Sequence, residues 1–229
     1  MEGDEGLTAG RSKCTIEPAD AARLTARQTI QLTRRQNVAE LKIDPAKTAL
    51  VVIDLQRGIV AVPSAPRAST EVVARAAQVA AALRKAGGTV VLVHVTPSAD
   101  GKDALKPITD ATPAAGRALP PDWADLVPEL GVQPTDIVIT KRHWGAFYGT
   151  ELDLQLRRRG VDTIILCGIS TSIGVESTAR DAYERGYNQI FVEDAMAARD
   201  PDDHRHTVLS LFPRLGRVRS AAEVIAAVR

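Results

Sequence analysis

The sequence has few of the residues that mark disulfide-rich, zinc-binding or base-stacking proteins. Its 229 residues include 2 cysteines, Cys14 and Cys167, and 4 histidines. Two cysteines cannot form a disulfide framework, and so few Cys and His argue against a zinc module. Aromatic residues make up 3% of the chain, which argues against a stacking platform for single-stranded nucleic acid or sugars.

An excess of one charge and a long apolar run are missing too. The 29 Lys and Arg residues nearly balance the 28 Asp and Glu residues, whereas a nucleic-acid binder usually carries a basic excess. No run reaches the roughly 18 apolar residues of a membrane-spanning helix. Residues 1–13 show no apolar segment behind a basic start, so no signal peptide is predicted. We therefore expect a cytoplasmic protein without a nucleic-acid or membrane partner.

The length and the pattern of the chain predict one large domain with an N-terminal extension. Residues 1–41 are expected to form a tail followed by a helical arm over 17–41, where apolar residues recur among Arg and Gln. Residues 42–229 are expected to form a single domain of a size that suits one α/β unit. The sequence shows no internal repeat and no interdomain linker.

Buried strands and amphipathic helices alternate through this domain. The apolar run Thr48–Leu55 is typical of a strand covered on both faces. The alternation predicts an α/β fold with a parallel sheet and right-handed crossovers. Strands are expected over 48–55, 89–95, 136–140, 162–167, 189–192 and 217–219, and helices over 69–86, 150–159, 174–185, 201–212 and 221–228.

Two charged residues stand at predicted strand ends, where ligands bind in open parallel sheets. Asp54 lies near the end of the first strand, and Lys141 directly follows the third. If both face one crevice, each perturbs the pKa of the other, which is how a proton-transfer pair is built. A purely structural salt bridge is the alternative.

The segment Gly168–Gly174 follows the fourth strand and precedes a helix. Backbone N–H groups at such a turn can stabilise an anion or a developing oxyanion. The glycine spacing is not that of a dinucleotide-binding loop. The alternative is an ordinary helix cap by Ser170, Thr171 or Ser172.

Three motifs in this order closely resemble the isochorismatase-like hydrolase superfamily: Ile53–Gln56, Lys141–Thr150 and Gly168–Ala182, with Val192–Ala195 continuing the match. The resemblance implies a three-layer, doubly wound, six-stranded parallel sheet. It also implies a homo-oligomer, a dimer or tetramer, with active sites near subunit contacts, and a cis peptide bond between Ile169 and Ser170.

The resemblance assigns catalytic roles but places a glycine where the family has its nucleophile. Asp54 matches the acid/base carboxylate, Lys141 the catalytic lysine, and Gly174 the position of the attacking cysteine. Without a side chain, Gly174 cannot form a thioester, and Cys167 is expected to be a core thiol. Members that hydrolyse a vinyl ether need no nucleophile, because a carboxylic acid protonates the substrate and water attacks. The resemblance thus implies a small-molecule hydrolase without a cysteine nucleophile.

Further residues are expected to bind the substrate. They are Gln56, Trp144, Phe147, Ile169, Ser170 and Thr171, although the aromatic residues could instead pack against another subunit. The metal-dependent members carry histidines after the first strand, and residues 57–67 contain none. No metal and no cofactor are therefore predicted.

Two other functions stay open. One is a catalytically inactive member that binds a ligand or serves as a structural homo-oligomer. The other is an amidase that uses activated water or a hydroxyl of Ser170, Thr171 or Ser172.

Of the histidines, His94 is expected to be a hydrogen-bonded core or rim residue. His204 and His206 are expected at the surface or at a subunit contact.

Overall fold

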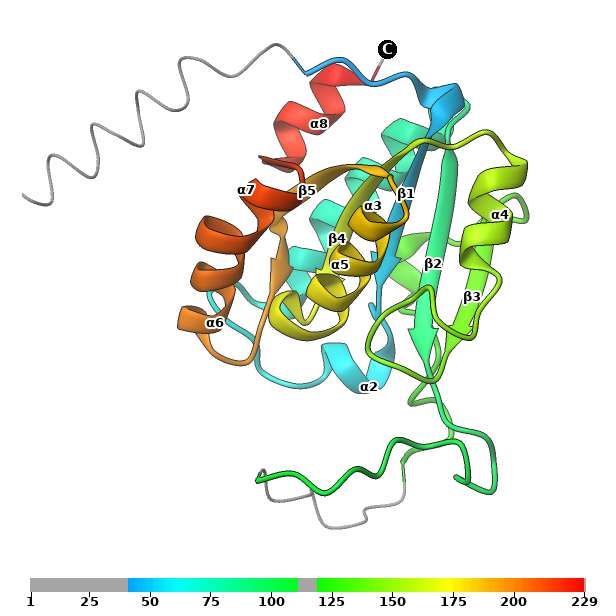
Figure 1. The fold of residues 1–229 in the computed structure, drawn as a ribbon, viewed down its shortest axis with the longest axis vertical. Helices are drawn as coiled ribbons and strands as arrows, with labels where there is room; N and C mark the ends of the chain where they lie inside the picture. The colour runs from blue at the N-terminus through cyan, green and yellow to red at the C-terminus, as the bar shows by residue number, and fades with distance from the viewer. Residues whose placement is uncertain (1–40, 111–118, 229) are drawn as a thin grey trace, which may run out of the picture. The chain divides into compact units, whose positions relative to one another are not determined.

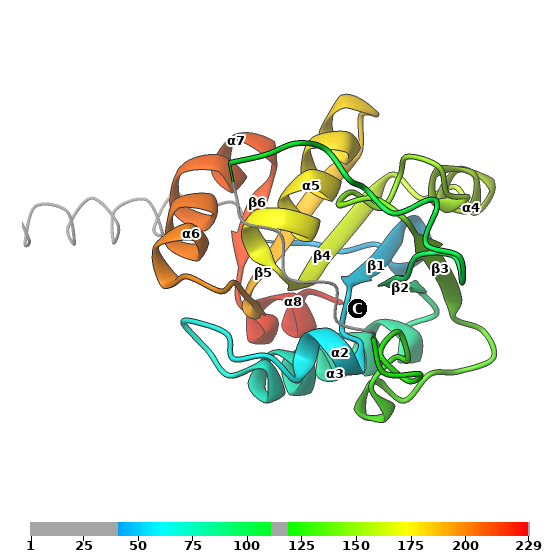
Figure 2. The same cartoon turned by 90° about the horizontal axis from the view of Figure 1, so that it is seen from below.

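The computed structural model describes residues 41–110 and 119–228, which form a parallel six-stranded sheet between two layers of helices (Figures 1 and 2). The strand order β3-β2-β1-β4-β5-β6 reverses direction between β1 and β4, so the doubly wound α/β fold is confirmed. The N-terminal arm predicted for residues 17–41 lies almost entirely outside the described residues. The strands are β1 Thr48–Ile53, β2 Thr89–Val95, β3 Ile137–Lys141, β4 Thr163–Ile169, β5 Asn188–Ala197 and β6 Arg217–Arg219.

Helices cover both faces of the sheet. Figure 2, seen from below, shows α3 and α8 on one side of the strands and α4, α5 and α7 on the other. The helices are α2 Arg57–Val60, α3 Ser69–Lys85, α4 Leu152–Arg158, α5 Glu176–Glu184, α6 Pro201–His206, α7 Phe212–Leu215 and α8 Ala221–Ala227. Short 3₁₀ helices span Pro45–Lys47 and Pro128–Leu130, and π-helical turns span Thr171–Val175 and Thr207–Leu211.

The central strand β1 is buried along its whole length. Alternate residues point to opposite faces of a strand, so Leu50 and Val52 pack with the α3 and α8 layer. Val51 and Ile53 pack with the α4 and α5 layer. This double burial is why the strand reads as an unbroken apolar run.

Strand β5 continues well beyond the end predicted at Val192. The acidic pair Glu193–Asp194 interrupts the apolar run, but Asp194 is neutralised inside the fold. Its carboxylate accepts hydrogen bonds from the Arg75 guanidinium and the Ala221 amide, each at 2.7 Å. The predicted helix over 201–212 is divided by a π-helical turn, and the short helix α2 was not predicted.

Strand β4 lies close to β1 at Gly168, just before the turn that follows β4. Gly168 is paired with Ile53 and has φ +125°, and a Cβ atom there would lie 2.1 Å from the Ile53 carbonyl oxygen. Only glycine fits this backbone conformation and this separation. The following peptide bond, Ile169–Ser170, is cis, as the resemblance implied.

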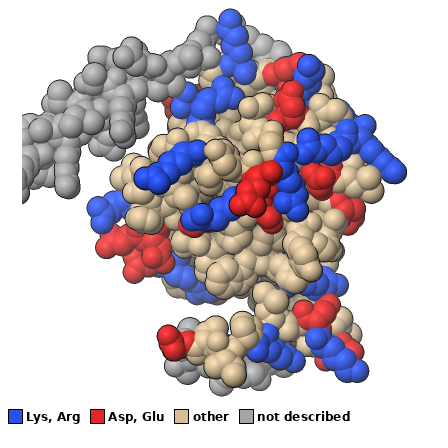
Figure 3. Space-filling view, in the orientation of Figure 1, with Lys and Arg blue, Asp and Glu red and all other residues tan. Residues whose placement is uncertain are grey.

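The face of the molecule in Figure 3 carries Lys and Arg side chains interspersed with Asp and Glu. On this face the balanced charge of the sequence is spread out rather than separated into areas of one sign. No helix of the described residues is long and apolar enough to cross a membrane.

We predict that Gly168→Ala destabilises the domain by about 3 kcal/mol or more, because the added Cβ forces β4 away from β1. Gly160→Ala is the matched control, since Gly160 also has positive φ (+67°) but no atom beyond its chain neighbours lies within 4 Å of its Cβ position. It should cost about 1–2 kcal/mol. Urea denaturation measures both, and equal losses would contradict the packing argument.

Candidate active site

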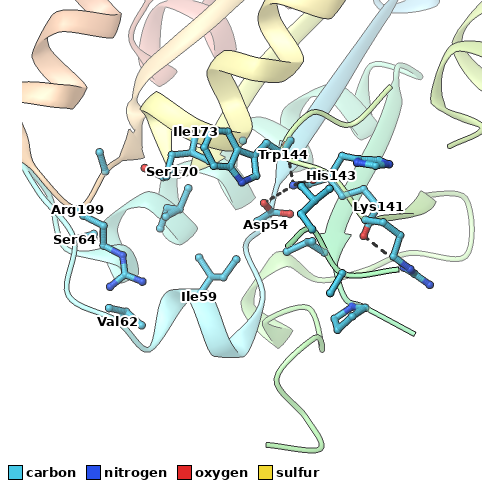
Figure 4. Close-up of a pocket in the computed structure, with 18 of the residues that line it drawn as sticks. Asp54, Ile59, Val62, Ser64, Lys141, His143, Trp144, Ser170, Ile173 and Arg199 are labelled. Atoms are coloured by element: carbon cyan, nitrogen blue, oxygen red, sulfur yellow. Dashed lines mark hydrogen bonds and ion pairs between the residues drawn. The ribbon is translucent and has the colours of Figure 1, made fainter. Parts of the chain in front are cut away.

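A cavity of about 370 Å³ opens beyond the carboxyl ends of β1 and β4, where the strand order reverses (Figure 4). Ligands bind at this place in doubly wound folds. Its lining is largely apolar and includes Ile59, Val62, Ile169 and Ile173. Asp54 and Lys141 both line it, so the structure brings the two predicted strand-end residues together.

Asp54 turns its carboxyl group into the cavity from a left-handed backbone conformation (φ 55°) directly after β1. Its amide donates to the Val93 carbonyl at 2.9 Å, and the residue is 4% exposed. The Oδ2 atom lies 2.8 Å from the Lys141 Nζ atom. The Oδ1 atom is buried without a hydrogen-bond partner, so one oxygen is held and the other is available to a ligand.

Burial raises the pKa of Asp54 to about 6, although the nearby Lys141 ammonium opposes the shift. Desolvation disfavours the charged carboxylate, whereas an opposite charge favours it. Asp54 can therefore hold or release a proton near neutral pH, as a general acid or base must.

Lys141 is 2% exposed and all its hydrogen-bonding capacity is used within the protein. Besides Asp54 Oδ2, its Nζ atom donates to the carbonyls of His143 (3.0 Å) and Trp144 (2.9 Å). An ammonium group has three donors. The geometry therefore favours Lys141 as the residue that orients Asp54 and the following loop, rather than as a ligand for a substrate carboxylate.

Gly174 lies beside Asp54 in the wall of the cavity. A Cβ atom at this position would lie 3.2 Å from Asp54 Oδ2 and 3.0 Å from the Ile53 side chain. The Thr178 hydroxyl fixes the turn, since it donates to the Gly174 carbonyl (2.7 Å) and accepts from the Ala146 amide (3.1 Å). A side chain at position 174 would therefore contact the acid.

Three of the predicted substrate-binding residues line the cavity. They are Trp144, Ile169 and Ser170. Trp144 is 61% exposed at the cavity's edge. The Ser170 hydroxyl is buried without a hydrogen-bond partner, so it is a second polar group available to a ligand.

The other three lie behind the cavity wall. The Gln56 side chain binds the backbone of Val95 and Trp123. Phe147 packs in the core against Tyr187. The buried Thr171 hydroxyl forms a 2.8 Å hydrogen bond with His204. These placements favour roles in supporting the wall rather than direct contact with a ligand.

The expectation that His204 lies at the surface is wrong, because His204 is 5% exposed. Burial, aided by Arg67, lowers the pKa of His204 to about 4, so the ring is neutral at pH 7. His206 is exposed, as expected. His94 is hydrogen-bonded at the rim, to the Ala124 carbonyl and the Thr140 hydroxyl, as expected.

Cys167 is the core thiol that the sequence predicts. It is fully buried in β4, and burial raises the pKa of its thiol to about 12. A thiol of this kind does not supply a thiolate nucleophile. Within residues 41–110 and 119–228, no group of three or more His, Cys, Asp or Glu side chains is arranged to hold a metal ion.

Sequence reasoning missed several residues of the cavity. Ile59 and Val62 belong to α2 and the segment after it, which carry no clear periodic signal. Arg199 follows the end of β5, and a longer predicted strand would have marked it as a strand-end residue.

The fold and the site define an α/β protein with a buried acid–lysine pair in the wall of a cavity. Residues 48–223 match the family model of the isochorismatase domain. The chain therefore belongs to the isochorismatase family.

Its relatives include proteins with and without a named activity. An uncharacterized isochorismatase family protein, YwoC of Bacillus subtilis, is 51% identical over 190 residues, 82% of this chain and 98% of the relative. Ureidoacrylate amidohydrolase RutB of Methylobacterium radiotolerans is 33% identical over 80% of each chain. The structure of an isochorismatase family protein from Burkholderia thailandensis superposes with a TM-score of 0.79 at 47% identity, covering 83% of this chain and 99% of the other.

We predict that Lys141→Met lowers the free energy of unfolding by about 3–5 kcal/mol at pH 8, because it leaves a buried carboxylate without its counterion. The pKa of Asp54 is raised in the folded protein, from an ordinary carboxyl value of 3.8 to about 6. The free energy of unfolding therefore falls as the pH rises between these two values. Removing Lys141 raises this pKa further, so the loss continues to higher pH. The destabilisation should be smaller at pH 5 than at pH 8.

Urea denaturation at the two pH values measures this difference. Lys85→Met, on the exposed end of α3, is the control and should stay within about 0.5 kcal/mol of wild type. A loss for Lys141→Met that does not depend on pH would contradict the coupling between Lys141 and Asp54.

Proposed function

We propose that the protein is a hydrolase of small molecules in which Asp54 is the general acid/base and water, rather than a cysteine, attacks the substrate. One observation carries the proposal: a buried carboxyl group with a pKa of about 6 faces the cavity with one oxygen unpaired. Lys141 orients this group, and Gly174 lies beside it at the position that the resemblance assigns to the nucleophile.

Hydrolysis of a vinyl ether suits this arrangement. Protonated Asp54 gives its proton to the terminal vinyl carbon, which leaves an oxocarbenium ion. Water adds to that ion and its proton returns to the Asp54 carboxylate. The hemiketal then breaks down to a carbonyl compound and an alcohol. A carboxyl group whose pKa is raised by an apolar environment is well suited to donate the proton.

Amide hydrolysis is the second candidate, and two observations favour it. RutB, at 33% identity, is named for hydrolysing an amide. The buried Ser170 hydroxyl, which lines the cavity without a partner, is positioned to contact a ligand. In this mechanism ionised Asp54 would act as a base toward water or toward that hydroxyl.

The wild type is first tested on a panel of vinyl ethers, amides, carbamoyl-amines and esters. For any compound that it hydrolyses, we predict that Asp54→Asn lowers kcat/KM by about 10²–10⁴-fold. Asp203→Asn is the same change on an exposed residue of α6 and should leave turnover intact. Full activity of Asp54→Asn would refute the role of Asp54. If the wild type hydrolyses no compound of the panel, the alternative of a catalytically inactive, ligand-binding protein is favoured instead.

The pH profile separates the two mechanisms. If Asp54 is the acid, kcat/KM falls about tenfold per pH unit above about 6, since only the protonated form reacts. If Asp54 is the base, kcat/KM instead rises as pH passes through that value. A flat profile from pH 5 to 8 would contradict both.

We also predict that Gly174→Cys, in a Cys14→Ser background, gains amidase activity that iodoacetamide abolishes. The new side chain would lie beside Asp54, which can take the proton of the thiol. Gly174→Ala adds the same Cβ without the thiol and should gain nothing. Wild-type activity should resist iodoacetamide, because Cys167 is buried. A Cys variant that folds but gains no thiol-dependent activity would contradict this role for position 174.

A further inference from the structure

A buried hydrogen bond joins α6 to the turn that contains Gly174, and the proposed reaction does not use it. The Thr171 hydroxyl and the His204 Nδ1 atom are 2.8 Å apart, and the two residues are 0% and 5% exposed. Figures 1 and 2 show α6 beside the turn that leads into α5. A satisfied buried hydrogen bond between segments distant in sequence fixes one segment against the other.

The His204 end of this bond rests on an anchored helix. The Asp200 side chain caps α6 by accepting a hydrogen bond from the Asp202 amide at 2.7 Å. The His204 amide donates to the Asp200 carbonyl at 3.3 Å. Just before the helix, Ala198 exchanges two 2.8 Å backbone hydrogen bonds with Ala65. The imidazole ring is therefore attached to a part of the backbone that is itself held in place.

The Thr171 end of the bond belongs to the turn that lies against the acid. Ser170 and Ile173 of this turn line the cavity (Figure 4). The Ser170 carbonyl accepts hydrogen bonds from the amides of Ile173 (3.2 Å) and Val175 (3.1 Å), which tie the turn together. Because the turn is a connected unit, a shift at Thr171 displaces the residues beside Asp54.

We propose that His204 is a positioning residue, which acts through Thr171 to hold the turn from Ser170 to Gly174 against Asp54 and to keep water from its carboxyl group. Position 174 is the closest part of this turn, since a Cβ atom there would lie 3.2 Å from Asp54 Oδ2. The inference rests on the proposed function for its effect on turnover, but not for its effect on Asp54 itself.

Carbon NMR titration of the Asp54 carboxyl group in the full-length protein tests the inference without a substrate. Thr171→Val removes the hydroxyl and keeps the shape of the side chain. The pKa of Asp54 should fall from about 6 to about 5, toward its ordinary value of 3.8, because water reaches the carboxyl group. The charged groups that act on Asp54, Lys141 and His94, are unchanged. The His204 ring stays neutral in this range, since burial and Arg67 lower its pKa to about 4.

Thr207→Val is the matched control. Thr207 is also buried (1% exposed), and its hydroxyl donates to the Glu176 carboxylate at 2.9 Å. This hydrogen bond joins the segment after α6 to the start of α5 rather than to the turn beside Asp54. The pKa of Asp54 should therefore stay at its wild-type value.

A double variant separates positioning from a contribution to stability. Thr171→Val with His204→Leu replaces both polar partners by apolar side chains, which restores much of the stability that either change alone removes. If His204 positions the turn, the pKa of Asp54 stays lowered in the double variant. On any compound that the wild type hydrolyses, kcat should stay about tenfold lower with KM little changed.

Three outcomes would overturn the inference: an unchanged pKa of Asp54 in Thr171→Val, a wild-type pKa in the double variant, or an equal fall in Thr207→Val. If Thr171→Val does not fold, the double variant alone decides. If the pKa falls as expected but Asp54→Asn changes no turnover, the role of His204 stands and the proposed hydrolysis fails.

Discussion

The candidate site depends on the buried ion pair between Asp54 and Lys141. A buried ammonium is tolerated only when its donors are satisfied, and here the satisfying groups are one carboxylate oxygen and the carbonyls of His143 and Trp144. The same three contacts fix the carboxyl group of Asp54 and the start of the loop after β3. Lys141 therefore determines both the chemistry of the acid and the shape of the cavity beside it.

The sheet makes this pair possible by bringing distant segments to one edge. Because β1 and β4 pack closely through Gly168, the turn that contains Gly174 lies against Asp54. Thr178 then bonds this turn to Ala146 in the loop that Lys141 organises. Acid, lysine and turn are thus parts of one rigid arrangement, as a preorganised catalytic site requires.

The layers of the fold and the central pair were predictable, because apolar runs mark buried strands and functional groups follow strand ends. Other parts of the site depend on long-range contacts that local patterns do not encode. Thr171 was expected to bind substrate, but His204, 33 residues away, binds its hydroxyl. Arg199 was missed because Asp194 interrupts the apolar run of β5, so the strand was predicted to end too early. In the structure, Arg75 and the Ala221 amide, both distant in sequence, stabilise the Asp194 carboxylate.

A glycine at position 174 changes what is required of Asp54. In a covalent mechanism the carboxylate must take a proton from a thiol, whereas here it has no thiol to deprotonate. The apolar wall raises its pKa to about 6, and a bound ligand would exclude more water and raise it further. A shift in this direction favours the protonated form of Asp54, which is the form that the proposed acid-catalysed hydrolysis needs.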